Sequence, residues 1–175
     1  MLKKLGIFEI DADVSKKYDE HILKQVEDEE SLKLLASMGI KKMFKGEMFY
    51  HAIRWDYFMG RTATFNLIGT IDNKIYKVYF KFLDDDRAAC IAFRDEIREY
   101  LSENMTAEQF RNPKITKRED ARLSTWHFDW GNILLEEFGV LTETGTIWNT
   151  AIASTSNAVK GAKRIGPLDR LFNRV

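Results

Sequence analysis

Residues 62–83, TATFNLIGTIDNKIYKVYFKFL, determine the fold class of this 175-residue chain. Apolar residues alternate with polar ones along residues 62–71 and again along residues 74–83, which is the pattern of two β-strands. The pair Asp72-Asn73 separates the two runs, and both residue types tolerate the positive φ angles that a two-residue hairpin turn requires. The sequence therefore predicts an antiparallel β-hairpin.

The register of this hairpin follows from its turn. If Ile71 and Lys74 flank the turn, every residue of one strand has a fixed partner on the other, and a slip of one residue would exchange the two faces. One face is then apolar, and we expect it to be buried. The pairs on that face are Leu67 with Val78, Phe65 with Phe80, and Ala63 with Phe82.

Length and composition indicate one domain with a substantial core. The chain is 45% apolar and 13% aromatic, and its 27 basic residues balance its 27 acidic residues. This zero net charge disfavours a dedicated nucleic-acid binder, which usually carries a basic excess. The only cysteine, Cys90, excludes an intrachain disulfide and any multi-cysteine metal site. No apolar run approaches the roughly 20 residues that span a bilayer, and no secretory signal follows Lys3 and Lys4, so we expect a soluble intracellular protein.

Patterns on either side of the hairpin predict its neighbours. Residues 6–10 suit a short strand, residues 14–38 suit two helices or one bent helix that stops at Gly39, and residues 47–55 suit a strand. The most regular helix runs from Asp86 to Glu103 and is expected to pack on the apolar face of the hairpin. Its apolar stripe comprises Ala89, Cys90, Phe93, Ile97, Tyr100 and Leu101, and its solvent side comprises Arg94, Asp95, Arg98 and Glu99.

The second half of the chain is predicted to return to strands. Residues 104–121 suit a connection with one helical turn at 107–110. Residues 123–140 suit a hairpin with a four-residue turn at 129–132, although a helix capped by Asp129 also fits, and residues 145–154 suit a further strand. The predicted fold class is α+β: a mostly antiparallel sheet of about five to seven strands with helices packed on one face. We expect a single domain over residues 1–155 and a basic amphipathic tail over residues 156–175.

Candidate catalytic groups are few. His127 and Asp129 share one face of a strand beside Asn132, so they are the pair on which an enzyme would be centred. The acidic run 84–86 is explained by helix capping, and Cys90 lies in an apolar stripe where thiols are inert. Phosphate-binding loops, nucleophile elbows and metal-binding motifs are absent, so the sequence disfavours an enzyme and predicts no cofactor and no metal.

Binding is the more favoured class of function, and it has two candidate surfaces. An aromatic pocket between sheet and helices, lined by Trp126, Trp130, Phe49 or Tyr50, would bind a small molecule or a nucleic acid. The tail combines bases with apolar residues and would dock on a partner protein, or on an anionic membrane surface. Its candidate contact residues are Lys160, Lys163, Arg164, Leu168, Arg170, Leu171 and Phe172. The leading hypothesis is a non-catalytic interaction module, as a subunit or assembly factor of a larger complex.

Residues 26–83 also carry a family resemblance. A helix ends at Leu34, Leu35, Gly39 and Ile40, and a hairpin follows with Gly60, Ala63, Phe65, Leu67 and Gly69. This order resembles the small α+β domain shared by cytochrome-oxidase assembly factors and the regulatory subunit of the mitochondrial presequence translocase. The resemblance implies a non-enzymatic, mitochondrial domain that docks on partners near a membrane. The chain departs from that family in lacking its transmembrane anchor and in having Asp72-Asn73 where turn glycines are expected.

Overall fold

The predicted hairpin forms the middle of the structure, which is a computed structural model that describes residues 3–54 and 56–163. Strand β7 spans Phe65–Ile71 and strand β8 spans Lys74–Asp84. Asp72 and Asn73 join them with φ angles of 49° and 64°, so both turn residues have the positive φ that was predicted. Ile71 pairs with Lys74 across the turn, which confirms the predicted starting register.

A β-bulge at Tyr76 changes the register of the rest of the hairpin. Thr70 pairs with Ile75, but Gly69 pairs with Lys77, so Tyr76 is an extra residue on β8. A Cβ on Gly69 would lie 2.9 Å from the Tyr76 ring, which shows that the ring lies directly over this glycine. The predicted pairs Leu67–Val78, Phe65–Phe80 and Ala63–Phe82 are therefore wrong, because Leu67 lies opposite Tyr79 and Phe65 opposite Lys81.

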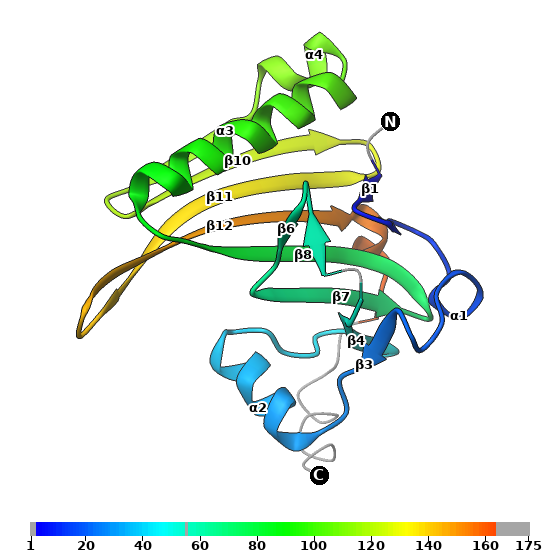
Figure 1. Ribbon diagram of the computed structural model, residues 1–175. Coiled ribbons are helices and arrows are strands. Elements are labelled where there is room, and N and C mark those ends of the chain that lie inside the picture. The colour runs from blue at the N-terminus through cyan, green and yellow to red at the C-terminus, as the bar shows by residue number, and fades with distance from the viewer. Residues whose placement is uncertain (1–2, 55, 164–175) are drawn as a thin grey trace.

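The shifted register gives this hairpin two apolar faces. Ile68, Val78 and Phe80 lie on one face within the main hydrophobic core. Leu67 lies on the other face in a second, smaller core, with Phe65 and Tyr79 packed against it. Helices consequently cover both sides of the sheet, and the prediction that they pack on one side only is wrong: α3 lies above the sheet and α2 below it (Figure 1).

The main sheet has eight antiparallel strands, more than the five to seven predicted. Its order is β3-β4-β7-β8-β12-β11-β10-β9. One half of the sheet consists of β3, β4, β7 and β8, the other half consists of β9 to β12, and the two halves meet where β8 pairs with β12. The remaining strands are β3 (Leu23–Gln25), β4 (Glu47–Ala52), β9 (Lys114–Arg118), β10 (Ala121–Phe128), β11 (Gly131–Thr142) and β12 (Gly145–Ser156).

The first 60 residues contain more short elements than their sequence pattern predicts. A small hairpin, β1 (Lys4–Leu5) with β2 (Phe8–Glu9), replaces the strand predicted over residues 6–10. The predicted helical segment divides into α1 (Val14–Lys17), β3 and α2 (Glu29–Ser37). Asp28 caps α2, and Gly39 has a φ of 77°, as expected for the residue after a helix. A second small hairpin joins β5 (Tyr57–Phe58) to β6 (Arg61–Thr62).

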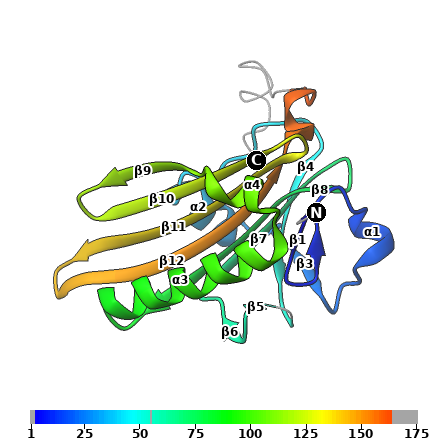
Figure 2. The same cartoon turned by 90° about the horizontal axis from the view of Figure 1, so that it is seen from above.

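Helix α3 spans Arg87–Asn104 and confirms the most regular helical prediction. The Asp86 side chain accepts a hydrogen bond from the Ala89 amide at 2.8 Å and caps the helix. The helix packs across β8, β12 and β11 (Figure 2). Two residues depart from the predicted solvent side: Arg94 is buried because its guanidinium pairs with Glu137 of β11, and the Arg98 guanidinium lies over the rings of Phe110 and Trp126. A short helix, α4 (Ala107–Arg111), follows, and the predicted connection also contains strand β9.

Strands β10 and β11 form the predicted hairpin rather than the alternative helix. Phe128 pairs with Gly131, so the turn consists of Asp129 and Trp130 alone, not of four residues. After β12 the chain forms the 3₁₀ helix η1 (Asn157–Lys160). The Ser156 hydroxyl donates to the Asp11 carboxylate at 3.1 Å, and the Asn157 amide donates to the Trp130 carbonyl at 2.7 Å. These bonds hold the end of β12 against the N-terminal segment and the β10–β11 turn.

Candidate functional site

The two tryptophans predicted to line a pocket are part of the core instead. Trp126 is 1% exposed, and its indole nitrogen donates to the Phe110 carbonyl at 3.2 Å. The Trp126 ring stacks on the Phe110 ring at 5.9 Å between centroids, and the Trp130 ring stacks on Phe128 at 5.1 Å. Phe49 is also buried, in the small core under α2. Three of the four residues predicted to line the pocket are therefore packed in the two cores, whereas Tyr50 is half-buried and lines an open surface pocket of about 640 Å³ beside β3.

His127 and Asp129 both lie on the surface of the protein. Both side chains are exposed, at the end of β10 and in the turn that follows it. Within the described residues, no hydrogen bond or ion pair joins them to each other or to a third polar side chain.

Most of the predicted tail contacts lie outside the described residues. These are Arg164, Leu168, Arg170, Leu171 and Phe172. Lys160 is the last residue of η1, and Lys163 is exposed. The Lys163 carbonyl accepts a hydrogen bond from the Lys45 amide at 2.9 Å, which fixes the chain beside the segment that precedes β4.

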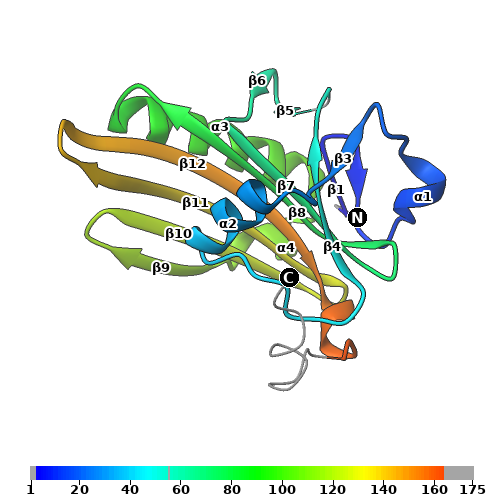
Figure 3. The same cartoon turned by 90° about the horizontal axis from the view of Figure 1, so that it is seen from below.

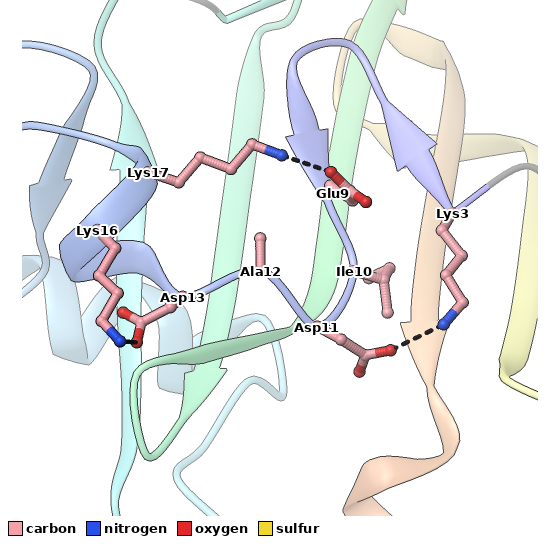
Figure 4. A pocket seen from close by; sticks show the side chains of 8 residues that line it. All are labelled: Lys3, Glu9, Ile10, Asp11, Ala12, Asp13, Lys16 and Lys17. Atoms are coloured by element: carbon pink, nitrogen blue, oxygen red, sulfur yellow. Dashed lines mark hydrogen bonds and ion pairs between the residues drawn. The ribbon is translucent and has the colours of Figure 1, made fainter.

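An open pocket of about 360 Å³ lies at the N-terminal segment, and its charged groups already pair with one another (Figure 4). Lys3 contacts Asp11 at 3.1 Å, Lys16 contacts Asp13 at 3.7 Å, and Lys17 pairs with Glu9. The Lys17 ammonium lowers the pKa of the Glu9 carboxyl, as expected for a close ion pair. Three lysines thus compensate three carboxylates, and the pocket leaves no charge for a ligand.

The most distinctive exposed feature is the far end of the β11–β12 hairpin. Strands β11 and β12 pair with each other as far as Thr142 and Gly145. The pairing of β10 with β11 ends at Phe138, and the pairing of β8 with β12 ends at Trp148. Residues 140–147 therefore extend beyond both neighbouring strands, and Figure 3 shows them projecting from the sheet. We call residues 140–147 the arm.

The arm carries apolar side chains in the open. Leu141 is 83% exposed, and Val140 and Ile147, which pair across the hairpin, are 46% and 41% exposed. Leu83 of β8 is 52% exposed and pairs with Asn149, two residues from Ile147. Because side chains alternate along a strand, Leu83, Val140 and Ile147 share one face of the sheet. Leu141 follows Val140 on the same strand and therefore lies on the opposite face, so both faces of the arm carry exposed apolar side chains.

The tip of the arm is a defined turn rather than a loose loop. The Thr142 hydroxyl donates to the Gly145 carbonyl at 2.7 Å and accepts from the Thr144 amide at 3.3 Å. Gly145 has a φ of 131°, which only glycine adopts readily. Glu143 is the only charged residue among residues 140–147. The arm is thus an ordered, nearly uncharged hairpin with an unpaired strand edge on each side.

The sequence pattern indicated strands at both sides of this tip but did not identify the arm. Residues 133–140 and 145–154 were expected to be strands, and they are. What distinguishes the arm is where the neighbouring strands stop, and on the β8 side that depends on pairing with residues at least 64 positions away (148 − 84 = 64). No local signal in residues 140–147 carries that information.

Residues 3–54 and 56–163 contain no group of three or more His, Cys, Asp or Glu side chains placed to hold a metal ion. Over the same ranges, no helix is both long and apolar enough to cross a membrane. Comparison of the chain with protein families, with curated protein sequences and with solved structures finds no match.

Proposed function

We propose that this protein is a non-catalytic interaction module that docks a partner protein on its arm. The observation that supports this proposal is the projection of a nearly uncharged, apolar hairpin beyond both neighbouring strands. Scattered apolar residues on a surface need no explanation, but exposed apolar side chains on both faces of one projecting element are typical of a protein–protein contact. The partner would cover Leu83, Val140, Leu141 and Ile147.

An edge strand of the same sheet shows how unpaired backbone groups are protected elsewhere in this protein. Strand β9 is an edge strand in which every residue is exposed, and it carries Lys114, Lys117 and Arg118. Charged edge residues, especially lysines, prevent a strand edge from pairing with other chains. The arm has two unpaired edges and lacks this protection, since threonine, glycine and β-branched residues dominate it. An unprotected edge of high β-propensity is a hazard unless a partner occupies it.

The chemistry of the arm also indicates how the partner binds. An unpaired edge offers main-chain N–H and C=O groups to an additional strand, and the exposed side chains offer apolar contact to its neighbours. We therefore expect the partner to add a strand beside residues 140–142 or 145–147 and to place apolar side chains on Leu141 and Ile147. Such an interface depends little on salt, because only Glu143 is charged.

Site-specific crosslinking tests this surface first. The chain is produced with Leu141→p-benzoylphenylalanine in its native cells, irradiated, and analysed by mass spectrometry. We expect a crosslinked partner from this position and none from the matched position Ile53, which is 47% exposed but lies outside the arm. Equal crosslinking from both positions, or none from position 141, would contradict the proposal. Crosslinking of the chain to itself would show that the arm binds a second copy and would exclude a heterologous partner as its occupant.

Titration with the purified partner then measures how much the arm contributes to the binding affinity. Leu141→Asp replaces the most exposed apolar side chain of the arm with a charge, and we expect it to weaken binding at least about tenfold. Leu34→Asp is the matched control, because Leu34 is 57% exposed on α2 and lies away from the arm. Calorimetric titration of both variants, after circular dichroism has verified their folding, measures the difference. An equal loss in the control would show that the arm is not the contact surface.

The basic tail is a second candidate contact of the same module. Truncation after Lys163 is the appropriate test, because it retains the Ser156–Asp11 and Asn157–Trp130 hydrogen bonds. If the tail contributes, the truncated chain binds the crosslinked partner more weakly than the full chain does. We expect this loss of affinity to be smaller than the loss caused by Leu141→Asp.

A further inference from the structure

A row of charged side chains crosses the α3 side of the sheet. Glu137 of β11 lies opposite Arg122 of β10, and Arg122 lies opposite Lys117 of β9. Arg94 and Arg98 lie one turn apart on α3, so both point to the same side of the helix. Arg94 donates to Glu137, which shows that this side of α3 faces the row.

Both carboxylates of this cluster already serve Arg94. Its Nη1 donates to Glu137, and its Nε and Nη2 donate to the Asp95 carboxylate at 3.0 and 2.8 Å. Within the described residues, Arg98 and Arg122 form no ion pair with a carboxylate. The cluster of Arg94, Arg98, Arg122 and Lys117 therefore has four cations against the two carboxylates, an excess of two positive charges.

Two guanidinium nitrogens of the cluster lack an acceptor. Arg98 Nη1 and Arg122 Nε are buried and, among the residues that the structure describes, have no hydrogen-bond partner. Buried polar atoms in folded proteins are nearly always satisfied, and a group that is not often contacts an ion or a water molecule. Burial lowers the pKa of Arg98, and the nearby charges of Arg122 and Arg94 lower it further. The Arg98 and Arg122 guanidinium groups thus repel each other and are partly desolvated, which destabilises the folded state. A bound anion would offset both effects.

The two arginines are also held in place. The Arg98 guanidinium lies over the rings of Phe110 and Trp126, at 5.4 and 5.9 Å from their centroids. Arg122 belongs to the middle of β10, which pairs on both sides. Guanidinium groups fixed in this way lose little further freedom on binding, and their planar donors match the oxygens of phosphate groups. The remaining nitrogens of both groups are available to an acceptor, because neither side chain donates a hydrogen bond within the described chain.

We propose that Arg98 and Arg122, with Lys117 at the rim, bind a doubly charged oxyanion of the phosphate type. The excess of two positive charges matches the charge of a phosphate dianion, and α3 and β10 supply donors from two directions. These residues are distinct from the arm and lie on α3, β9 and β10, so the site does not depend on docking at residues 140–147.

Thermal unfolding in inorganic phosphate tests the site on the full chain. The phosphate concentration is varied while sodium chloride keeps the ionic strength constant, because screening alone changes the stability of a charged cluster. We expect the melting temperature to rise with phosphate, since a ligand that binds only the folded state stabilises it. Arg122→Met and Arg98→Met should each weaken phosphate binding at least about tenfold, measured independently by calorimetric titration.

Arg118→Met is the matched control. Arg118 is on the neighbouring strand β9, but alternation places its side chain on the opposite face of the sheet. This variant should bind phosphate like the unmodified chain. Equal loss in Arg118→Met and Arg122→Met, or equal melting temperatures in phosphate and in chloride, would overturn the proposal. Phenyl phosphate in place of inorganic phosphate distinguishes the sources: tighter binding indicates an esterified group, and weaker binding a free ion.

Folding of the variants is not expected to limit this test. Arg122 makes no hydrogen bond or ion pair within the described chain, so methionine removes an unpaired charge rather than a contact. In chloride alone, Arg122→Met should therefore melt no lower than the unmodified chain. If Arg122→Met unfolds in chloride, the Arg122 guanidinium must already have a stabilising partner within the protein. That result would contradict the argument for the site.

Discussion

Replacement of Phe80 by alanine is expected to lower the free energy of unfolding by about 4 kcal/mol. The Phe80 ring is completely buried, and it packs on the rings of Phe8, Phe58 and Phe82 with centroid distances of 6.3, 6.2 and 6.5 Å. These contacts join β8 to the two small hairpins that precede it. The truncation would leave a cavity among separate elements, and strands fixed in a ladder cannot move together to fill it.

Urea unfolding followed by circular dichroism measures this loss, with Phe138→Ala as the control. Phe138 of β11 is only partly buried and lies on the side of the sheet opposite α3. The same truncation there should cost about 1 kcal/mol, since less apolar surface is lost from the folded state. Comparable losses at the two positions would show that Phe80 is not the centre of the core.

Neutralisation of Glu137 is expected to cost about 3 kcal/mol. The side chains of Glu137 and Arg94 are 9% and 11% exposed, so each depends on the other for its charge to be compensated. Glu137→Gln keeps the size of the side chain but leaves Arg94 beside Arg98 and Arg122 with only the exposed Asp95 carboxylate. Removal of one member of a buried ion pair is costly because the remaining charge is uncompensated.

The neighbouring residue, Glu136, provides a control in which the same substitution is not expected to lower the free energy of unfolding. Glu136 lies on the other face of β11, and burial raises the pKa of its carboxyl, while the charge of Arg118 lowers it by less. A carboxyl with a raised pKa destabilises the folded state once it is ionised. Glu136→Gln should thus leave stability unchanged or raise it slightly at neutral pH. If both substitutions destabilise equally, the burial of an ion pair is not the reason for the cost at Glu137.

The contribution of Glu136 to stability is expected to decrease as the pH rises. The folded state holds the proton of Glu136 more tightly than the unfolded state does, so stability decreases as the pH rises through the raised pKa. Below the ordinary glutamate pKa of about 4.3 the carboxyl is protonated in both states. Any gain from Glu136→Gln should therefore be present at neutral pH and disappear below that value, as urea unfolding at a series of pH values can show.

Local patterns predicted the turn and the main helix, but not the full register of the hairpin. Asp72-Asn73 and the Asp86 cap act on residues within three positions, so their effects can be inferred from sequence. The bulged residue, Tyr76, has its side-chain partner far away in the sequence: its hydroxyl donates a hydrogen bond to the Glu47 carboxylate. Because that partner is 29 residues away, alternation alone gave the wrong pairs beyond Gly69.

The candidate site residues were missed for a related reason. Arg94 was predicted to face solvent because a charged residue on a helix normally does, but its partner Glu137 is 43 residues distant. Strand β9 was missed because it is an exposed edge strand in which no alternation of burial exists to be detected. The sequence pattern favours Trp126 and Trp130 as ligand contacts, but both are buried, as large aromatic residues that form the core of a domain usually are.

The order of the strands has a consequence for synthesis on the ribosome. Residues 23–84 supply one set of neighbouring strands and residues 114–156 supply the other, and the two sets meet only where β8 pairs with β12. While the chain is being made, β8 leaves the ribosome long before β12, so one side of β8 has no partner until β12 has been made. Pairing over such a separation is slow to form. The nascent chain must therefore keep the edge of β8 from aggregation during that interval, and any chaperone that protects it would release it when residues 145–156 emerge.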